Sequence, residues 1–361
     1  MPERMWKRIL RRKPNSPWSI VAFFLWLASL VYRIGFVLKR CWVGEPVRVT
    51  VPVISVGNIT VGGSGKTPIV ARLAEGLIGH GFRVGIVSSG YGRSENTAFL
   101  APGKSVLEMD VAKTGDEVKL LAQLLPKAVL SVDSCKWRAA QKLADSGKVD
   151  LIIVDDGFQH FKLARDIDLV AFDATLDRQL LRPFPCGVLR ESLKALGRAN
   201  IVFITRTGLA SDLDAIEKEL REYAPQSSFY RTDFGATMIV GYGTNRSVKC
   251  LEGKTVLLFA GVGNFDALAQ QVQSLSAKPV HTLEFSDHQR YSRPVLEMIR
   301  REAEQHHSDL ILTTLKDWVK VGNFDFGREF YYLEQTVDLE PDADKLLAEI
   351  KSRLNLITRG T

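Results

Sequence analysis

Residues 53–68 read VISVGNITVGGSGKTP, an apolar, β-branched run followed by a glycine-rich loop that ends in Gly-Lys-Thr. This pattern predicts a buried strand, a phosphate-binding loop and a helix over 69–78. In such a loop the backbone N–H groups surround phosphates, and the helix N-terminus adds its positive end. Since these features occur in the order that nucleotide binding requires, the sequence predicts a nucleoside triphosphate site.

Each position of this loop has an expected role. Lys66 is expected to reach the β- and γ-phosphates, and the Thr67 hydroxyl to bind Mg²⁺. One alternative is a glycine-rich turn that precedes Lys-Thr by chance, because a threonine replaces the first glycine of G-x-x-x-x-G-K-[ST]. The full set of expected nucleotide-binding residues is Thr60, Val61, Gly62, Gly63, Ser64, Gly65, Lys66 and Thr67.

A second motif, residues 151–160, reads LIIVDDGFQH. Four apolar β-formers deliver Asp155 and Asp156 to a strand end, which is the form of a Walker B element. Such carboxylates bind Mg²⁺ directly or through water, beside the phosphates that Lys66 contacts. Because this motif follows the phosphate loop by about ninety residues, ATP and Mg²⁺ are the expected cofactors.

Charge is distributed unevenly along the 361 residues. The net charge of +7 lies entirely in residues 1–45, and the remaining chain carries equal numbers of acidic and basic residues. A general nucleic-acid-binding face is therefore not supported. Cys41, Cys135, Cys186 and Cys250 are scattered without metal-site spacing, so free thiols are expected.

The N-terminal segment contains fifteen uncharged, mostly apolar residues over 18–32. Arg33 interrupts the run, which then continues over 34–38, so a helix over 18–38 is expected. A membrane-spanning helix needs about 20 apolar residues. The short run, its aromatic residues and its basic flanks favour a helix that enters one leaflet of a membrane with anionic lipids. The alternatives are a signal peptide, which would need a cleavage site that the sequence lacks, and a buried helix of the globular domain.

The rest of the chain alternates apolar strands and amphipathic helices, which predicts an α/β fold. We expect a P-loop-type, mostly parallel sheet with helices on both faces. The predicted divisions are a basic segment with a membrane-associated helix (1–45), a nucleotide-binding domain (46–224), a linker with short strands (225–250) and a smaller α/β domain (251–361). A Gly-x-Gly at 261–263 lacks the third glycine of a dinucleotide fingerprint, so no second cofactor is expected.

Further polar motifs follow in one order along the chain. They are Gly-Tyr-Gly at 90–92, Gly-Asp-Glu at 115–117, Leu-Arg-Glu at 189–191, Asp-His at 287–288 and Thr-Leu-Lys-Asp at 314–317. Taken with the phosphate loop and the Asp-Asp-Gly-Phe-Gln-His string, this series resembles the tetraacyldisaccharide 4′-kinases of lipid A biosynthesis. The resemblance extends from the apolar N-terminal helix to about residue 320.

The resemblance implies a function. The γ-phosphate of ATP would pass to the 4′-hydroxyl of an acylated glucosamine disaccharide 1-phosphate at the cytoplasmic face of the bacterial inner membrane. It implies that Asp116 and His288 form a catalytic dyad beside Lys66, and that Asp155, Asp156 and Glu191 serve Mg²⁺. The expected partners are the lipid substrate and an anionic membrane surface, with neither nucleic acid nor an obligatory protein partner.

Three departures from the family pattern concern substrate contacts more than the chemistry. Ser89 replaces an arginine, Val118 replaces a proline, and residues 184–186 read Phe-Pro-Cys where Pro-Ala-Gly is usual.

Two alternative functions are a membrane-tethered nucleotide switch and a soluble small-molecule kinase. The chain lacks the [NT]-K-x-D motif of guanine-binding switches, since Asp317 directly follows Lys316.

Overall fold

The computed structural model describes residues 19–62, 64–241, 247–248, 251, 253–262, 265–275, 278–286, 289–322, 324–340 and 343–355. The strands of the described residues are β1 (Val53–Asn58), β2 (Val84–Ser88), β3 (Phe99–Pro102), β4 (Val129–Val132), β5 (Leu151–Asp155), β6 (Ile167–Asp173), β7 (Ile201–Thr205), β8 (Ser228–Gly241), β9 (Ser247–Val248), β10 (Thr255–Ala260), β11 (Lys278–Glu284), β12 (Leu310–Thr314) and β13 (Glu329–Glu340).

The helices are α2 (Ser19–Trp42), α3 (Lys66–Gly79), α4 (Gly103–Glu108), α5 (Val111–Thr114), α6 (Asp116–Leu124), α7 (Lys136–Asp145), α8 (Leu213–Tyr223), α9 (Phe265–Ser274), α10 (Arg293–Gln305), α11 (Leu315–Val321) and α12 (Ala343–Arg353). Short 3₁₀ turns cover Arg178–Leu180, Leu193–Arg198 and Thr207–Leu209.

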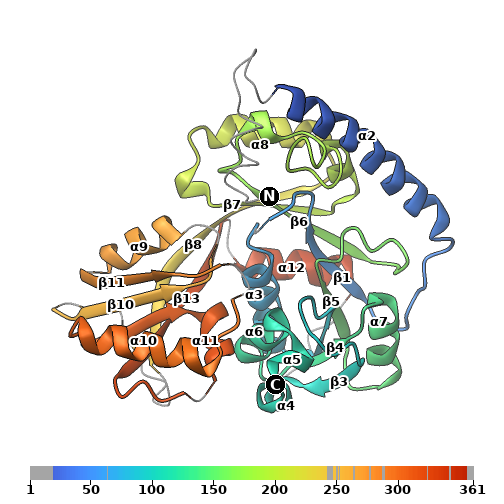
Figure 1. The fold of residues 1–361 in the computed structure, drawn as a ribbon. Helices are drawn as coiled ribbons and strands as arrows, with labels where there is room; N and C mark the ends of the chain where they lie inside the picture. Colours follow the sequence, from blue (N-terminus) through green and yellow to red (C-terminus); the bar gives the residue numbers. More distant parts are fainter. Residues whose placement is uncertain are drawn as a thin grey trace.

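These strands form one sheet in the described part of the chain (Figure 1). Its order is β11-β10-β12-β13-β8-β7-β6-β1-β5-β2-β4-β3, with β9 paired to β8. Most neighbours are parallel, and antiparallel pairs occur at β3–β4, β8–β9 and β8–β13. The expected mainly parallel α/β fold with helices on both faces is confirmed.

Strand β1 lies inside the parallel half, between β5 and β6. Every residue of β1 and β5 is buried, which explains why both strands read as continuous apolar runs and not as alternating ones. Because the strands are parallel, the loops that follow β1 and β5 leave the same edge of the sheet. The phosphate loop and the Asp155-Asp156 turn are therefore neighbours.

The predicted linker over 225–250 contains β8 and β9. Strand β8 pairs in parallel with β7 on one side and antiparallel with β13 on the other. Its fourteen residues therefore join the nucleotide-binding half to the C-terminal half through continuous backbone hydrogen bonding. The exact domain boundaries stay a prediction, but the connection between the halves is a strand of the common sheet.

Helix α12 differs from the predicted division of the chain. Its residues Leu346, Leu347 and Ile350 belong to the same buried cluster as Leu73 and Leu77 of α3. Although α12 ends the described chain, it thus packs on the nucleotide-binding half (Figure 1). The amphipathic pattern of residues 341–354 shows that one face is buried, but it does not identify the neighbour that covers this face.

Helix α2 extends four residues beyond the predicted helix over 18–38 and ends at Trp42. It continues past Arg33 and spans 24 residues, and only Ala22 and Ser29 are buried. By length and by a mean hydropathy of 2.1 over 18 residues it is a candidate membrane span. It runs along the outside of the molecule (Figure 1), so the alternative of a buried core helix does not fit.

Candidate active site

The phosphate loop is held by contacts with a neighbouring segment. The Val61 N–H donates to the Val188 carbonyl at 2.7 Å, and the Arg190 N–H donates to the Ile59 carbonyl at 2.8 Å. Gly65, which precedes α3, has φ +78°, a left-handed conformation that favours glycine. Lys66 and Thr67 are the first two residues of α3, as the motif predicts, whereas Gly63 lies outside the described residues.

Asp156 faces this loop from the turn after β5. Its carboxylate lies 3.5 Å from Lys66 Nζ and 2.9 Å from Arg190 Nη1. Burial alone would raise the pKa of Asp156, but the charges of Lys66, Lys136 and Arg190 outweigh it and lower the pKa to about 2. Asp156 is therefore a carboxylate at neutral pH.

Asp155 has the opposite electrostatic environment. Burial and the charge of Glu117 raise its pKa to about 6, against the attraction of Lys136. Its Oδ1 atom is buried and has no hydrogen-bond partner in the described part of the chain. A divalent cation fits this oxygen, because a buried carboxylate without a partner is costly and Mg²⁺ prefers oxygen ligands.

The ammonium group of Lys136 supports the turn that carries both carboxylates. Its Nζ donates to the carbonyl oxygens of Asp155 and Asp156, each at 2.7 Å. Burial lowers the pKa of Lys136, while the charges of Asp156 and Asp155 oppose that shift. Asp156 has φ +49°, which is uncommon for a residue with a side chain. The two hydrogen bonds hold this conformation.

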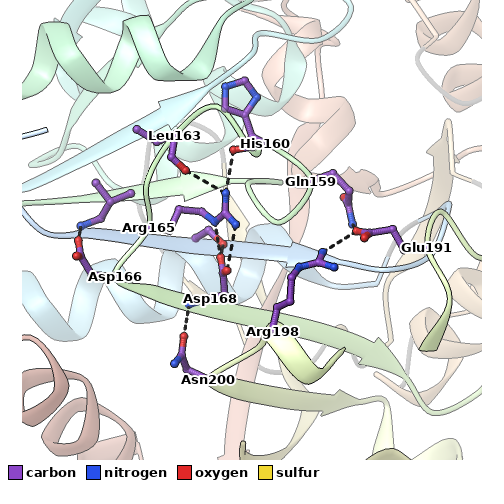
Figure 2. A network of polar contacts seen from close by, with 11 residues as sticks. Gln159, His160, Leu163, Arg165, Asp166, Asp168, Glu191, Arg198 and Asn200 are labelled. Carbon is purple, nitrogen blue, oxygen red and sulfur yellow. Dashed lines mark hydrogen bonds and ion pairs between the residues drawn. The ribbon is translucent and has the colours of Figure 1, made fainter. Parts of the chain in front are cut away.

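Glu191 is bound in a network beside that turn (Figure 2). Its Oε1 accepts from Arg198 Nη2 at 2.9 Å and from Gln159 Nε2 at 3.0 Å, and Gln159 Nε2 also donates to the Asn58 carbonyl at 2.8 Å. These contacts tie the Leu-Arg-Glu segment to the loop after β1. These two donors engage Oε1, and the expected role of Glu191 at Mg²⁺ stays a prediction from the resemblance.

Arg165 holds the C-terminal end of the Asp-Asp-Gly-Phe-Gln-His segment through hydrogen bonds (Figure 2). Its guanidinium donates to the carbonyl oxygens of His160 and Leu163 and pairs with Asp168 at 2.7 Å. Burial, followed by the charges of Lys136 and Arg165, lowers the pKa of His160 to about 4. His160 is thus neutral and accepts a hydrogen bond from the Trp137 N–H at 3.2 Å.

Asp116 begins α6 and meets the C-terminal half of the chain. Its Oδ2 lies 3.7 Å from Lys320 Nζ, which also pairs at 2.8 Å with the fully buried Asp317. The Asp317 carboxylate accepts from the Gly261 N–H and the Thr314 hydroxyl. This arrangement attaches Asp116 to α11. His288, its expected partner in catalysis, lies outside the described residues.

Several basic residues of the site could not be recognised from the sequence motifs. Lys136, Arg198 and Lys320 lie in none of those motifs. Lys136 is nevertheless unusual, because it is the first residue of α7 and a cation at a helix N-terminus opposes the helix dipole. Such an unfavourable position could have indicated a specific role. Lys320 and Arg198 lie within ordinary amphipathic turns, and only the folded chain brings them to their carboxylates.

Comparison with known proteins identifies the family. The sequence matches the model of tetraacyldisaccharide-1-P 4′-kinase over residues 21–355. The chain belongs to this family.

Relatives and a solved structure agree with that assignment. Tetraacyldisaccharide 4′-kinase of Desulfotalea psychrophila is 33% identical over 336 residues, covering 91% of this chain and 93% of the relative. The enzyme of Pelobacter propionicus is 34% identical over 313 residues, covering 84% and 83%. The "apo" form of LpxK from Aquifex aeolicus in complex with ATP superimposes with a TM-score of 0.74 at 26% identity, covering 92% of this chain and 99% of that chain.

These matches confirm the resemblance inferred from the motifs. The chain is a phosphotransferase of the tetraacyldisaccharide 4′-kinase family that uses ATP with Mg²⁺, acting in lipid A biosynthesis. The alternative of a nucleotide switch is not favoured.

Of the expected free thiols, Cys41, Cys135 and Cys186 are free, and Cys250 lies outside the described residues.

The support of the acidic turn by Lys136 can be tested by Lys136→Met. This variant retains the aliphatic stem but leaves two carbonyl groups without their charged donor, and each such bond contributes about 1.5–3 kcal/mol. We expect the free energy of unfolding, measured by urea denaturation, to fall by about 3 kcal/mol or more, and kinase activity to fall with it.

Lys142→Met on the same helix is the matched control. Lys142 is half-exposed and lies 3.8 Å from Asp133, so its loss should cost at most about 1 kcal/mol. Equal destabilisation by the two variants would contradict the role assigned to Lys136.

Proposed function

We propose that this chain transfers the γ-phosphate of ATP to the 4′-hydroxyl of an acylated glucosamine disaccharide 1-phosphate at the cytoplasmic face of the bacterial inner membrane. The observation that carries the proposal is the convergence of Lys66, Asp155 and Asp156 at one edge of the sheet, in a chain of this kinase family. The proposal adds residue roles and a location to the family assignment.

Lys66 and Arg190 are the groups that would bind the transferred phosphate. Both contact Asp156 in this structure, so their cationic groups lie together at the phosphate loop. Thr67, with Asp155 or Asp156, would hold Mg²⁺, which when bound would add positive charge beside the phosphates. Phosphoryl transfer depends mainly on such positioning and charge stabilisation.

Asp116 and His288 are proposed as the catalytic dyad. As the 4′-oxygen bonds to the γ-phosphorus and the bond to the β-γ bridging oxygen breaks, the hydroxyl proton passes to Asp116. His288 would orient and stabilise this carboxylate. The position of Asp116 supports the assignment, because α6 begins where the Gly-Tyr-Gly turn approaches. A Cβ atom on Gly115 would lie 2.9 Å from the Tyr91 carbonyl oxygen.

Helix α2 is proposed to lie in the membrane surface. Its outward residues are apolar and strongly exposed, with Ile20 at 70%, Val31 at 67% and Trp42 at 85%. Its inner side contacts the site-bearing half through edge-to-face pairs of Tyr32 with Phe184 and Phe36 with Phe161. The helix would thus bring the phosphate loop to a lipid substrate, in the manner of interfacial helices.

The contact between α2 and the segment before Leu-Arg-Glu contains a cavity of 310 Å³. Apolar and basic side chains line it together, which suits an acylated and phosphorylated sugar. The lining residues are Trp26, Ser29, Leu30, Arg33, Arg182, Pro183 and Cys186.

The dyad is tested by Asp116→Asn and His288→Ala, with kcat measured for phosphate transfer to dispersed lipid substrate. Loss of proton transfer should lower kcat by about 10²–10⁴-fold, while the affinity for ATP stays within about twofold because neither residue belongs to the phosphate loop. Asp110→Asn, at the cap of α5, is the control and should retain its turnover. Unchanged turnover in both test variants would reject the dyad.

Membrane association is tested with the triple variant Ile20→Glu, Val31→Glu, Leu38→Glu, using sedimentation with vesicles that contain anionic lipid. Burying each apolar side chain is worth about 1.5–3 kcal/mol, so vesicle binding should weaken by more than about tenfold. Leu209→Glu, at a 75%-exposed leucine outside α2, controls for added charge. Equal vesicle binding by the triple variant and the control would contradict the proposal.

A further inference from the structure

A second cluster of metal-ligating side chains lies in the C-terminal half, outside the kinase site. It consists of His281 on β11, Glu302 in the last turn of α10, and His306, which follows that helix. His281 Nε2 lies 3.2 Å from Glu302 Oε2, and His306 Nε2 lies 3.5 Å from the same oxygen. The three ligand atoms lie within 4.8 Å of one another.

The two imidazole–carboxylate distances are close to the edges of a zinc coordination tetrahedron. Zn–N and Zn–O bonds of about 2.0–2.1 Å in tetrahedral geometry place neighbouring ligand atoms about 3.3 Å apart. Two imidazole nitrogens and one carboxylate are a common ligand set for zinc, whereas Mg²⁺ prefers oxygen ligands alone. The side chains are 30–35% exposed, so a metal ion can enter and water can occupy the fourth position.

The local structure holds the three ligands together. Glu302 and His306 are four positions apart, and the His306 N–H donates to the Glu302 carbonyl at 3.0 Å as it caps α10. The His281 and His306 rings stack with centroids 4.1 Å apart and planes inclined by 11°. Both imidazoles thus reach the same carboxylate oxygen from adjacent positions. Because the lone pairs lie in the ring planes and these planes are nearly parallel, both rings must rotate out of the stack to bind a shared ion.

We propose that His281, Glu302 and His306 bind one Zn²⁺ ion, with water as the fourth ligand. The ion would link β11 to α10, which are the two elements that flank residues 285–292. That intervening segment carries His288, the residue assigned above to the catalytic dyad from sequence. Zinc would therefore stabilise the contact between β11 and α10, without itself taking part in phosphate transfer.

The experiment titrates Co²⁺, and then Zn²⁺, into the full-length protein after chelator treatment in detergent. One equivalent of Co²⁺ should give visible d–d absorption without a thiolate charge-transfer band, and Zn²⁺ should displace it and raise the Tm. Removing one of three ligands should weaken binding by about 100-fold or more, since even outer-shell changes cost about 10–100-fold. Glu302→Gln and His306→Asn should both show this loss.

His307→Asn is the matched control. His307 adjoins His306 but is exposed and outside the cluster, and its φ of +52° is one that asparagine tolerates. It should bind zinc as the unsubstituted protein does. A metal-free Tm close to that of the control will show that each test variant is folded.

Three results would overturn the proposal. The first is that the unsubstituted protein binds neither Co²⁺ nor Zn²⁺. The second is that Glu302→Gln and His306→Asn both bind the metal as tightly as the unsubstituted protein. The third is a thiolate charge-transfer band, which would assign the metal to a cysteine. The first would leave the cluster as contacts between the Glu302 carboxylate and two imidazoles. Because the readouts are absorbance and Tm, they are independent of the proposed kinase reaction.

Discussion

The hydrogen bonds from the Lys136 ammonium to the carbonyls of Asp155 and Asp156 are the contacts on which the kinase site depends. They fix a turn in which Asp156 adopts a left-handed backbone conformation and faces Lys66, while Asp155 points a buried oxygen away from any protein donor in the described residues. Two adjacent acids thereby acquire different environments. One is held as a carboxylate by cations, and the other is suited to a metal ion.

The same site is coupled to the C-terminal half by packing and by charge. Leu315 and Val319 of α11 pack with Leu120 and Leu124 of α6, and Lys320 bridges Asp317 and Asp116. Strands β8 and β13 also join the halves in one sheet. Helix α12, packed on α3, adds a further connection.

Much of this arrangement could be predicted from sequence because it rests on local patterns. Continuous apolar runs predicted β1 and β5, and their parallel pairing placed Lys66 beside Asp156, as the motifs indicated. The neighbour of α12 and the role of Lys136 could not be predicted, since each depends on a contact between distant segments. For Glu191 the resemblance implied metal binding, whereas its Oε1 is engaged by Arg198 and Gln159.

The central claim is that this chain phosphorylates a lipid with chemistry located at the Lys66 loop. The most direct measurement is transfer of label from γ-labelled ATP to a detergent-dispersed acylated disaccharide 1-phosphate, with the unsubstituted protein and Lys66→Ala side by side. The account predicts labelled lipid from the unsubstituted protein and none from Lys66→Ala. ATP hydrolysis without labelled lipid, or equal labelling by both proteins, would contradict it.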